Sequence, residues 1–206
     1  MIVQVSFDDG ASTDLKIADL MMKYDVKPVF YWPSMLGKHK NMGKAKSWLS
    51  LNECKELSKN FEIGSHSMTH QFLNKLDIST MSNEITGSRK FWQDQTGQAI
   101  ESFAYPKNSL SNLTKVLIKG AGYKKARTST TGLLTPGDDA FAINCTLQIA
   151  INRLEYKNKS WVLFSQEMMS KITENSVFHL FGNSWEVEEY NEWDRLEDLL
   201  KQLKGF

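Results

Sequence analysis

Two small groups of residues in this chain have the types and spacing that metal-dependent chemistry uses. The first is the adjacent carboxylates Asp8 and Asp9, and the second is the histidine pair His66 and His70. Two histidines four residues apart lie on one face if the segment is helical, so both imidazoles can bind one divalent ion. With one Asp carboxylate they offer two nitrogens and one oxygen, and they leave coordination positions open as catalytic sites do.

Each group also has a simpler interpretation. Asp8-Asp9-Gly10 alone is typical of a solvated turn, and the histidines could be one core and one surface residue. Adjacent acids after a buried strand are costly to hold unless a cation or a shared proton compensates. Zinc suits two imidazoles and a carboxylate best, although cobalt, nickel or manganese fit the same ligands.

Strands and helices must position these groups, and the two alternate along the whole chain. We expect strands at residues 2–7, 28–32, 61–64, 102–105, 123–127, 140–145 and 177–181, and helices at 15–24, 51–59, 79–92, 113–120, 161–169 and 193–203. This alternation is typical of a parallel sheet or a β/α barrel, in which functional residues collect where strands end. No repeat, linker or change of composition divides the chain, so we expect one domain over residues 1–206.

The composition is that of an ordinary globular domain. Hydrophobic residues make up 41% and charged residues 24% of the 206 residues. The formal net charge is +1, so the overall charge does not favour binding to nucleic acid or to an anionic membrane. No apolar run is long enough to span a membrane, and no signal peptide opens the chain, so we expect a cytoplasmic protein unless a targeting segment was removed. Cys54 and Cys145 are expected to be buried free thiols.

The chain resembles the polysaccharide deacetylases, the NodB-like domain family, in two motifs and their spacing. These are Ser6-Phe7-Asp8-Asp9-Gly10 and His66-Ser67-Met68-Thr69-His70, with weaker similarity at 28–32, 103–106 and 181–185. The resemblance covers essentially the whole chain. It implies an α/β fold, a distorted (β/α) barrel with about seven parallel strands.

The resemblance also implies a metal-dependent hydrolase that removes N- or O-acetyl groups from an acetylated carbohydrate. By this likeness Asp8 would be the general base, while Asp9, His66 and His70 would hold a divalent metal ion such as zinc. A backbone N–H at Lys107, beside Pro106, would be the family's oxyanion donor.

One departure from the family concerns an arginine. Many members carry Arg two residues before the proline of the third motif, and Ala104 stands there in this chain. Arg127, at the end of the following strand, could reach the same end of the barrel and replace it, because the interaction depends on where the guanidinium lies and not on which strand carries it. The alternative is that Arg127 is a surface cation.

A second departure concerns the proton donor. Phe181 fits the apolar residue that lines the family's acetyl pocket, but Asn183 stands where members place a histidine that protonates the leaving group. An amide cannot deliver a proton near neutral pH. Activity is therefore reduced, or the acid comes from elsewhere, such as His39, whereas His179 is expected to be a core histidine.

Aromatic residues around the expected mouth include Tyr105 and Trp185, which either stack on sugar rings or pack in the core. Two other functions remain open. One is a NodB-like domain that binds sugar without turning it over, and the other is a metal-dependent amidohydrolase acting on a small non-sugar C–N bond. The sequence leaves the sugar and the oligomeric state open.

Overall fold

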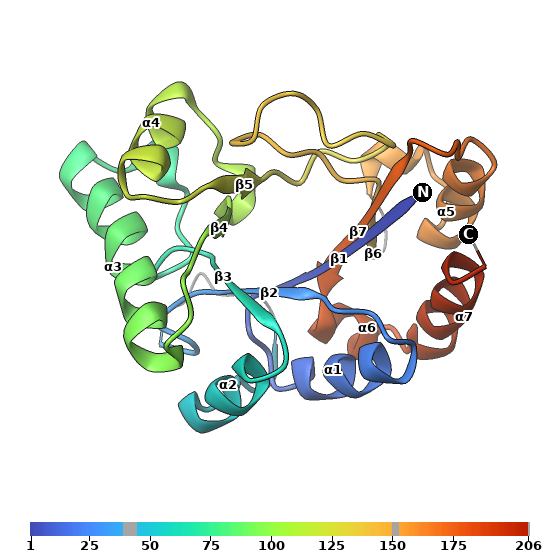
Figure 1. The fold of residues 1–206 in the computed structure, drawn as a ribbon, viewed down its shortest axis with the longest axis horizontal. Helices are drawn as coiled ribbons and strands as arrows, with labels where there is room; N and C mark the ends of the chain where they lie inside the picture. The colour runs from blue at the N-terminus through green and yellow to red at the C-terminus, as the bar shows by residue number, and fades with distance from the viewer. Residues whose placement is uncertain (39–44, 150–152, 206) are drawn as a thin grey trace.

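The computed structural model describes residues 1–38, 45–149 and 153–205. Seven strands form one sheet in the order β5-β4-β3-β2-β1-β7-β6, and every pair of neighbours is parallel. The strands are β1 (Ile2–Asp8), β2 (Val29–Trp32), β3 (Glu62–Ser65), β4 (Ser102–Ala104), β5 (Lys125–Arg127), β6 (Leu147–Ile149) and β7 (Val177–Asn183). The sheet curls into an incomplete barrel (Figure 1), which confirms the expected distorted β/α fold.

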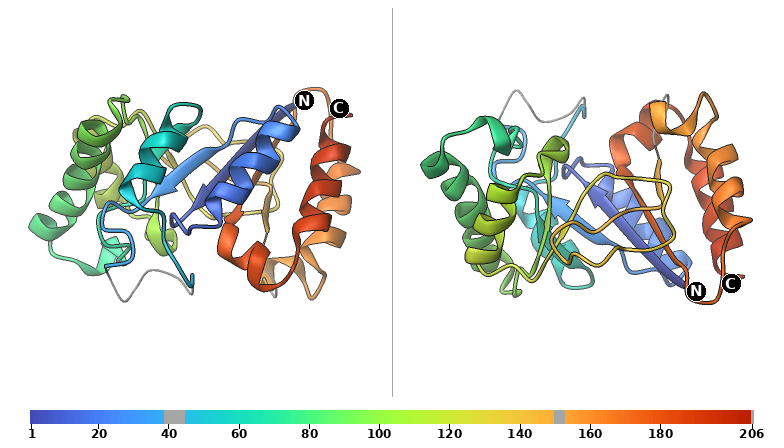
Figure 2. Two further views of the ribbon diagram at one scale, coloured as in Figure 1. Left: turned by 90° about the horizontal axis from the view of Figure 1, so that it is seen from below. Right: turned by 90° about the horizontal axis from the view of Figure 1, so that it is seen from above.

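Helices cover the outside of the curled sheet, as two views at right angles to the first also show (Figure 2). They are α1 (Asp14–Lys23), α2 (Leu51–Ser58), α3 (Ile78–Thr96), α4 (Asn112–Gly120), α5 (Trp161–Met169), α6 (Ser184–Glu189) and α7 (Trp193–Leu203), with short 3-10 turns η1 (Leu73–Lys75), η2 (Pro106–Asn108) and η3 (Leu154–Tyr156). Ser50 and Glu53 form the reciprocal capping box that fixes the start of α2.

A buried polar network joins the elements beneath the mouth of the barrel. Asp14, at the start of α1, accepts hydrogen bonds from the indole of Trp32 on β2 at 2.9 Å and from the hydroxyl of Ser184 on α6. Burial raises the pKa of Asp14 to about 8, against the hydrogen bonds from Ser184 and Trp32. The Trp92 indole on α3 donates to the Trp32 carbonyl at 2.8 Å, so Trp32 bonds to α1 and α3, while Asp14 links α1 to α6.

The strand expected over residues 140–145 is wrong. That segment runs as a loop that makes one parallel bridge, from Ile143 to Arg127, and the sixth strand is β6. Backbone N–H groups of the loop donate to carbonyls in and just after β5: that of Ile143 to Ala126, and that of Cys145 to Thr130. An apolar run therefore lies beside β5 without continuing the ladder, while Leu147 pairs with Leu180 on β7.

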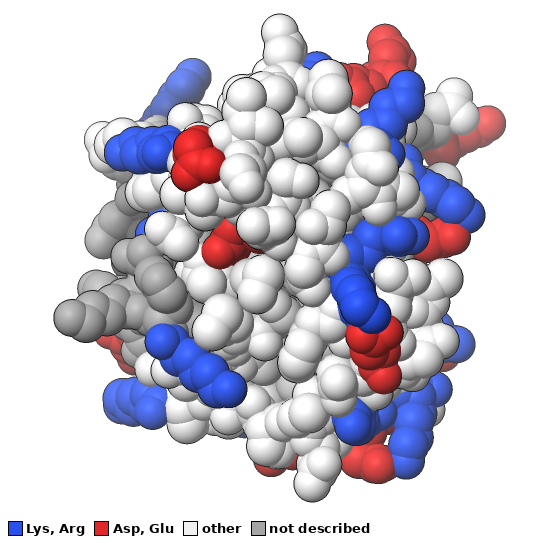
Figure 3. Space-filling model, turned by 90° about the vertical axis from the view of Figure 1, so that its left-hand side faces the viewer, with Lys and Arg blue, Asp and Glu red and all other residues white. Residues whose placement is uncertain are grey.

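The remaining expectations differ from the structure by a few residues, apart from α6, which the sequence analysis missed. Cys54 and Cys145 are buried and free, as expected. Among the helices of the described residues, none combines the length and apolar character that crossing a bilayer requires. Both signs of charge lie interspersed on the face that carries α3 (Figure 3).

Candidate active site

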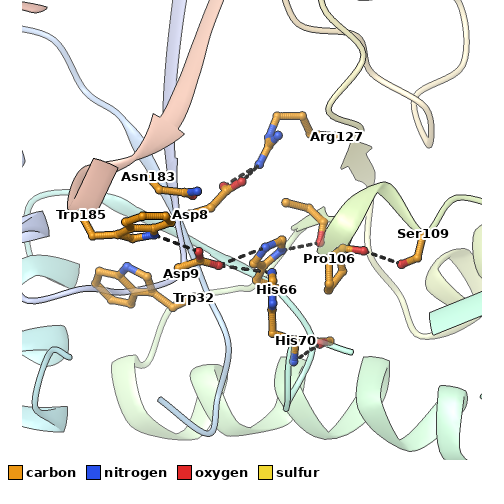
Figure 4. Close-up of polar contacts among 12 residues, drawn as sticks. Asp8, Asp9, Trp32, His66, His70, Pro106, Ser109, Arg127, Asn183 and Trp185 are labelled. Carbon is orange, nitrogen blue, oxygen red and sulfur yellow. Dashed lines mark hydrogen bonds and ion pairs between the residues drawn. The ribbon is translucent and has the colours of Figure 1, made fainter. Parts of the chain in front are cut away.

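The chemistry-bearing side chains gather at the carboxyl ends of the strands. Asp8 is the last residue of β1, Asp9 follows it, and His66 comes directly after β3 (Figure 4). Asp9 has a left-handed backbone with φ +78° and donates its N–H to the Tyr31 carbonyl at 3.1 Å. This turn points the two adjacent carboxylates in different directions, Asp8 toward Arg127 and Asp9 toward the histidines (Figure 4).

Asp9, His66 and His70 form a buried cluster. One ligand atom from each lies within 4.8 Å of the other two. Asp9 Oδ1 is 3.3 Å from His70 Nε2 and 3.7 Å from His66 Nε2, and it has no hydrogen-bond partner among the described residues. A buried carboxylate oxygen that faces two imidazole nitrogens fits a divalent cation, since burying such an oxygen otherwise costs free energy.

His66 is oriented as a metal-binding imidazole. Its Nδ1 lies 2.8 Å from the Ala104 carbonyl, which can only accept, so Nδ1 carries the proton and Nε2 faces Asp9. Burial, with a contribution from nearby His70, lowers the pKa of His66 to about 3. The ring is therefore neutral at physiological pH, and its Nε2 lone pair is free to bind a metal ion.

His70 reaches the cluster through a loop, not through the helix that would place both rings on one face. Ser67 and His70 have left-handed backbones with φ of 63° and 55°, and the His70 N–H donates to Ser67 Oγ at 3.1 Å. The buried carboxylate of Glu84 on α3 accepts from the N–H groups of Met68 and Thr69, both at 2.9 Å. The two rings end with centroids 4.7 Å apart, so the spacing brings the histidines together without a helix.

Arg127 reaches the mouth of the barrel and pairs with Asp8, and it is not a surface cation. Its Nη2 donates to Oδ1 and Oδ2 of Asp8 at 2.5 and 2.6 Å, and Arg127 is only 3% exposed. The guanidinium lies over the rings of Phe181 and Tyr31, with its carbon 4.5 and 5.1 Å from their centroids.

Burial raises the pKa of the Asp8 carboxyl, and the Arg127 guanidinium opposes that rise. Ala104 is the register partner of Arg127 on the adjacent strand. The arginine therefore comes from β5 at the point where β4 carries a small side chain.

Asn183 ends β7 directly opposite Asp8 on β1. Its amide Nδ2 donates to Glu186 Oε2 at 3.1 Å, while the Trp185 indole donates to Asp9 Oδ2 at 3.4 Å. Sequence reasoning missed Glu186. The signal in the sequence was the position of Glu186 three residues after Asn183, a spacing at which side chains make polar contacts at the start of a helix.

The other predicted residues are placed as follows. Lys107 lies in η2 with a left-handed backbone, and its ammonium is 4.8 Å from the centre of the Phe72 ring. Tyr105 is buried, and its hydroxyl donates to the Phe141 carbonyl at 2.8 Å. The roles of Lys107, Tyr105, Phe181 and Trp185 toward a substrate stay predictions.

His179 is a core histidine, as expected. It is buried opposite Gln4, toward the amino end of β1, and its Nε2 lies 3.1 Å from Ser6 Oγ. Burial lowers its pKa to about 3. His39, the other suggested source of a proton, lies outside the described residues.

The fold and site together define a β/α-barrel protein with a buried Asp-His-His cluster beside an arginine-paired carboxylate. The chain belongs to the polysaccharide deacetylase family, whose sequence profile matches residues 2–126. The chain is also similar to a bifunctional xylanase/deacetylase of Pseudobutyrivibrio xylanivorans, with 27% identity over 112 residues. That match covers 54% of this chain and 17% of the relative, so the chain spans only a small part of the relative's length.

Solved structures of deacetylases share the fold. A family 4 carbohydrate esterase from Streptomyces lividans in complex with acetate superposes with a TM-score of 0.63 at 12% identity, covering 98% of this chain and 89% of that one. The Streptococcus pyogenes deacetylase PplD in complex with acetate gives 0.62 at 21% identity, covering 69% and 62%. A family 4 pseudoenzyme from Bacillus anthracis gives 0.66 at 17% identity, covering 99% and 60%.

Proposed function

We propose that this chain is a metal-dependent deacetylase that hydrolyses N- or O-acetyl groups of a carbohydrate. The observation that carries the proposal is the division of two adjacent carboxylates. Asp9 faces two imidazoles, and Asp8 lies next to it, paired with Arg127. Family membership and the deacetylase relatives support the same reaction class.

Asp9, His66 and His70 would hold the metal, with zinc as the first choice. The donor set fits, because Asp9 Oδ1 is buried without a hydrogen-bond partner among the described residues and faces both Nε2 atoms. A bound divalent ion supplies Lewis acidity, which polarises a carbonyl and makes water more acidic. The three ligands leave room for substrate and water, which a closed structural site does not.

Asp8 accepts the proton of the attacking water. Burial raises the pKa of its carboxyl and makes the carboxylate a stronger base than a free aspartate, while the Arg127 guanidinium favours the ionised form and fixes its orientation. Each Asp8 oxygen accepts one hydrogen bond from Arg127 and keeps a second lone pair, so either oxygen can accept the proton of water.

Substrate is held by the residues around this pair. The Lys107 N–H stabilises the developing oxyanion, Phe181 lines the acetyl pocket, and Trp185 offers a partly exposed ring to a sugar face. Tyr105, which directly precedes η2, would contribute to substrate binding from the segment that follows β4.

A second candidate, a sugar-binding domain without turnover, is favoured by one observation. Asn183 stands where the family's proton donor is expected and cannot perform that step. The structural similarity to the Bacillus anthracis pseudoenzyme makes this alternative worth testing directly.

Metal analysis and an acetate-release assay separate these functions. The zinc-loaded chain is incubated with acetylated chitooligosaccharides, peptidoglycan fragments, acetylated xylan and small N-acetylated amines that contain no sugar. Acetate release from a carbohydrate supports the proposal. Sugar binding without release at high protein concentration supports the second candidate, and release from the small amides alone supports an amidohydrolase.

A further inference from the structure

The carboxyl group of Glu186 accepts a hydrogen bond from Asn183, the residue that stands where the family's proton donor is expected. We propose that Glu186 supplies this proton in place of the histidine that Asn183 replaces. The inference rests on the proposed deacetylase function and adds a catalytic residue to it. Glu186 belongs to α6, which begins immediately after β7.

Two contacts hold this first turn of α6 against the site. Asn183 lies opposite Asp8, and its amide donates to Glu186 Oε2 at 3.1 Å. Trp185, the residue before Glu186, donates to Asp9 Oδ2 at 3.4 Å. The Glu186 carboxyl is thus one hydrogen bond away from the residue that faces the general base, and Figure 4 shows Asn183 between Asp8 and Trp185.

The surroundings of Glu186 suit a proton donor. Burial raises its pKa to about 7, and the charge of Asp9 at the end of β1 and that of Glu189 on the same helix add to the rise. The hydrogen bond from Asn183 and the cation Arg153 oppose it. In the chain without a bound metal ion, a large fraction of Glu186 therefore carries a proton near neutral pH, where an ordinary glutamate with a pKa of about 4.3 does not.

The proton transfers balance across the reaction. Asp8 takes one proton as water oxygen bonds to the acetyl carbon. As the bond between that carbon and the leaving nitrogen or oxygen breaks, its electron pair goes to the leaving atom, which takes the proton of Glu186. Acetate and the free amine or alcohol leave, and proton exchange with solvent restores Asp8 and Glu186.

Glu186 could instead serve only as a polar contact at the start of α6. Such a contact would affect stability, and replacing the carboxylate with an amide that still accepts from Asn183 would leave the pH dependence of catalysis unchanged. Glu186→Gln therefore separates the two roles. Glu188→Gln, an exposed change on the same helix that removes only a surface ion pair with Lys16, is the matched control.

The test measures kcat against pH for zinc-loaded wild type, Glu186→Gln and Glu188→Gln, with zinc content determined for each. We expect Glu186→Gln to lose about 10²-fold or more in kcat, with zinc content unchanged. The wild-type rate should fall as pH rises through the pKa of Glu186, and this alkaline limb should be absent from the variant's residual activity. Glu188→Gln should retain the wild-type kcat.

Two further measurements complete the test. The double variant with Asn183→His and Glu186→Gln should regain activity, because an imidazolium then supplies the proton. Carbon-13 NMR of the side-chain carboxyls, with and without zinc, should show a resonance that titrates near pH 7 without zinc and is missing in Glu186→Gln. Zinc beside Asp9 should lower that midpoint.

The outcomes distinguish the inference from the function it rests on. An active wild type matched in rate and pH profile by Glu186→Gln contradicts the role of Glu186 alone. A glutamate that titrates near its ordinary pKa in the zinc-free chain does the same. A zinc-loaded wild type that releases no acetate from any substrate contradicts the proposed function and the role of Glu186 with it.

Discussion

Replacing Arg127 with methionine tests how strongly the guanidinium favours the ionised form of Asp8, the predicted base. Methionine retains much of the volume between the Tyr31 and Phe181 rings while removing the charge and both hydrogen bonds to Asp8. Two charge-assisted hydrogen bonds of about 1.5–3 kcal/mol each amount to about 3–6 kcal/mol. Removing one partner of a buried ion pair typically costs about 3–5 kcal/mol, which agrees.

The cost should depend on pH in a defined direction. Burial already holds the pKa of folded Asp8 above its ordinary value, and loss of Arg127 raises it further. Wherever Asp8 is ionised in wild type but protonated in the variant, the folded variant holds an extra proton and its relative stability falls with rising pH. At low pH, where Asp8 is protonated in both proteins, only the packing difference remains.

The assay is urea unfolding of both proteins from pH 4 to pH 8, with thermal melts and acetate release in parallel. Near neutral pH we expect a loss of about 3–5 kcal/mol, or roughly 6–20 °C in melting temperature, and acetate release that begins only at higher pH than in wild type. Lys90→Ala, which removes an exposed ion pair with Asp94, should change neither stability nor activity measurably. A stability loss independent of pH would refute the electrostatic reasoning and leave only lost packing.

Three further predictions follow from the site and its supports. His66→Ala should abolish stoichiometric zinc binding in equilibrium dialysis, and unchanged metal content would exclude the cluster as the metal site. Asp8→Asn should lower turnover by about 10²-fold or more while zinc stays bound, whereas Asp9→Asn should weaken zinc affinity; equal zinc loss in both would contradict the division of roles. As pH rises from 5 to 9, Asp14→Asn should lose less stability than wild type. In wild type, protonated and buried Asp14 favours the folded state, and this contribution is lost as pH rises through about 8. Parallel pH profiles for the two proteins would argue against a raised pKa.

The cluster of Asp9, His66 and His70 could be predicted because ligand type and strand-end position are both visible in the sequence. Strand ends of a parallel sheet converge on one edge, so residues far apart in the chain meet there whatever the intervening loops do. This is why the two histidines meet although the segment between them is a loop and not a helix. Strand pairing is less visible, because an apolar run such as residues 140–145 can pack beside β5 without joining the ladder.

Glu186 was missed because its relevance depends on burial, which spacing alone does not reveal. A glutamate near the start of a short helix is ordinary, and its raised pKa arises from desolvation and the nearby charges of Asp9 and Glu189. The charge of Asp9 comes near Glu186 only when β1 and β7 pair. The chemistry of such a residue is a property of the assembled mouth of the barrel.

Arg127 shows how a motif can be altered in sequence while its charge is kept in space. Ala104 and Arg127 are register partners on adjacent parallel strands, so their side chains leave the sheet at neighbouring points of the same face. The guanidinium from β5 reaches Asp8 and lies in buried space beside Phe181 and Tyr31, where a second arginine from β4 would add another buried charge. The small residue at 104 is thus the counterpart of the arginine at 127. Considered alone, Ala104 lacks the arginine of the motif. The pairing of β4 with β5 shows that Arg127 supplies a guanidinium from the neighbouring strand.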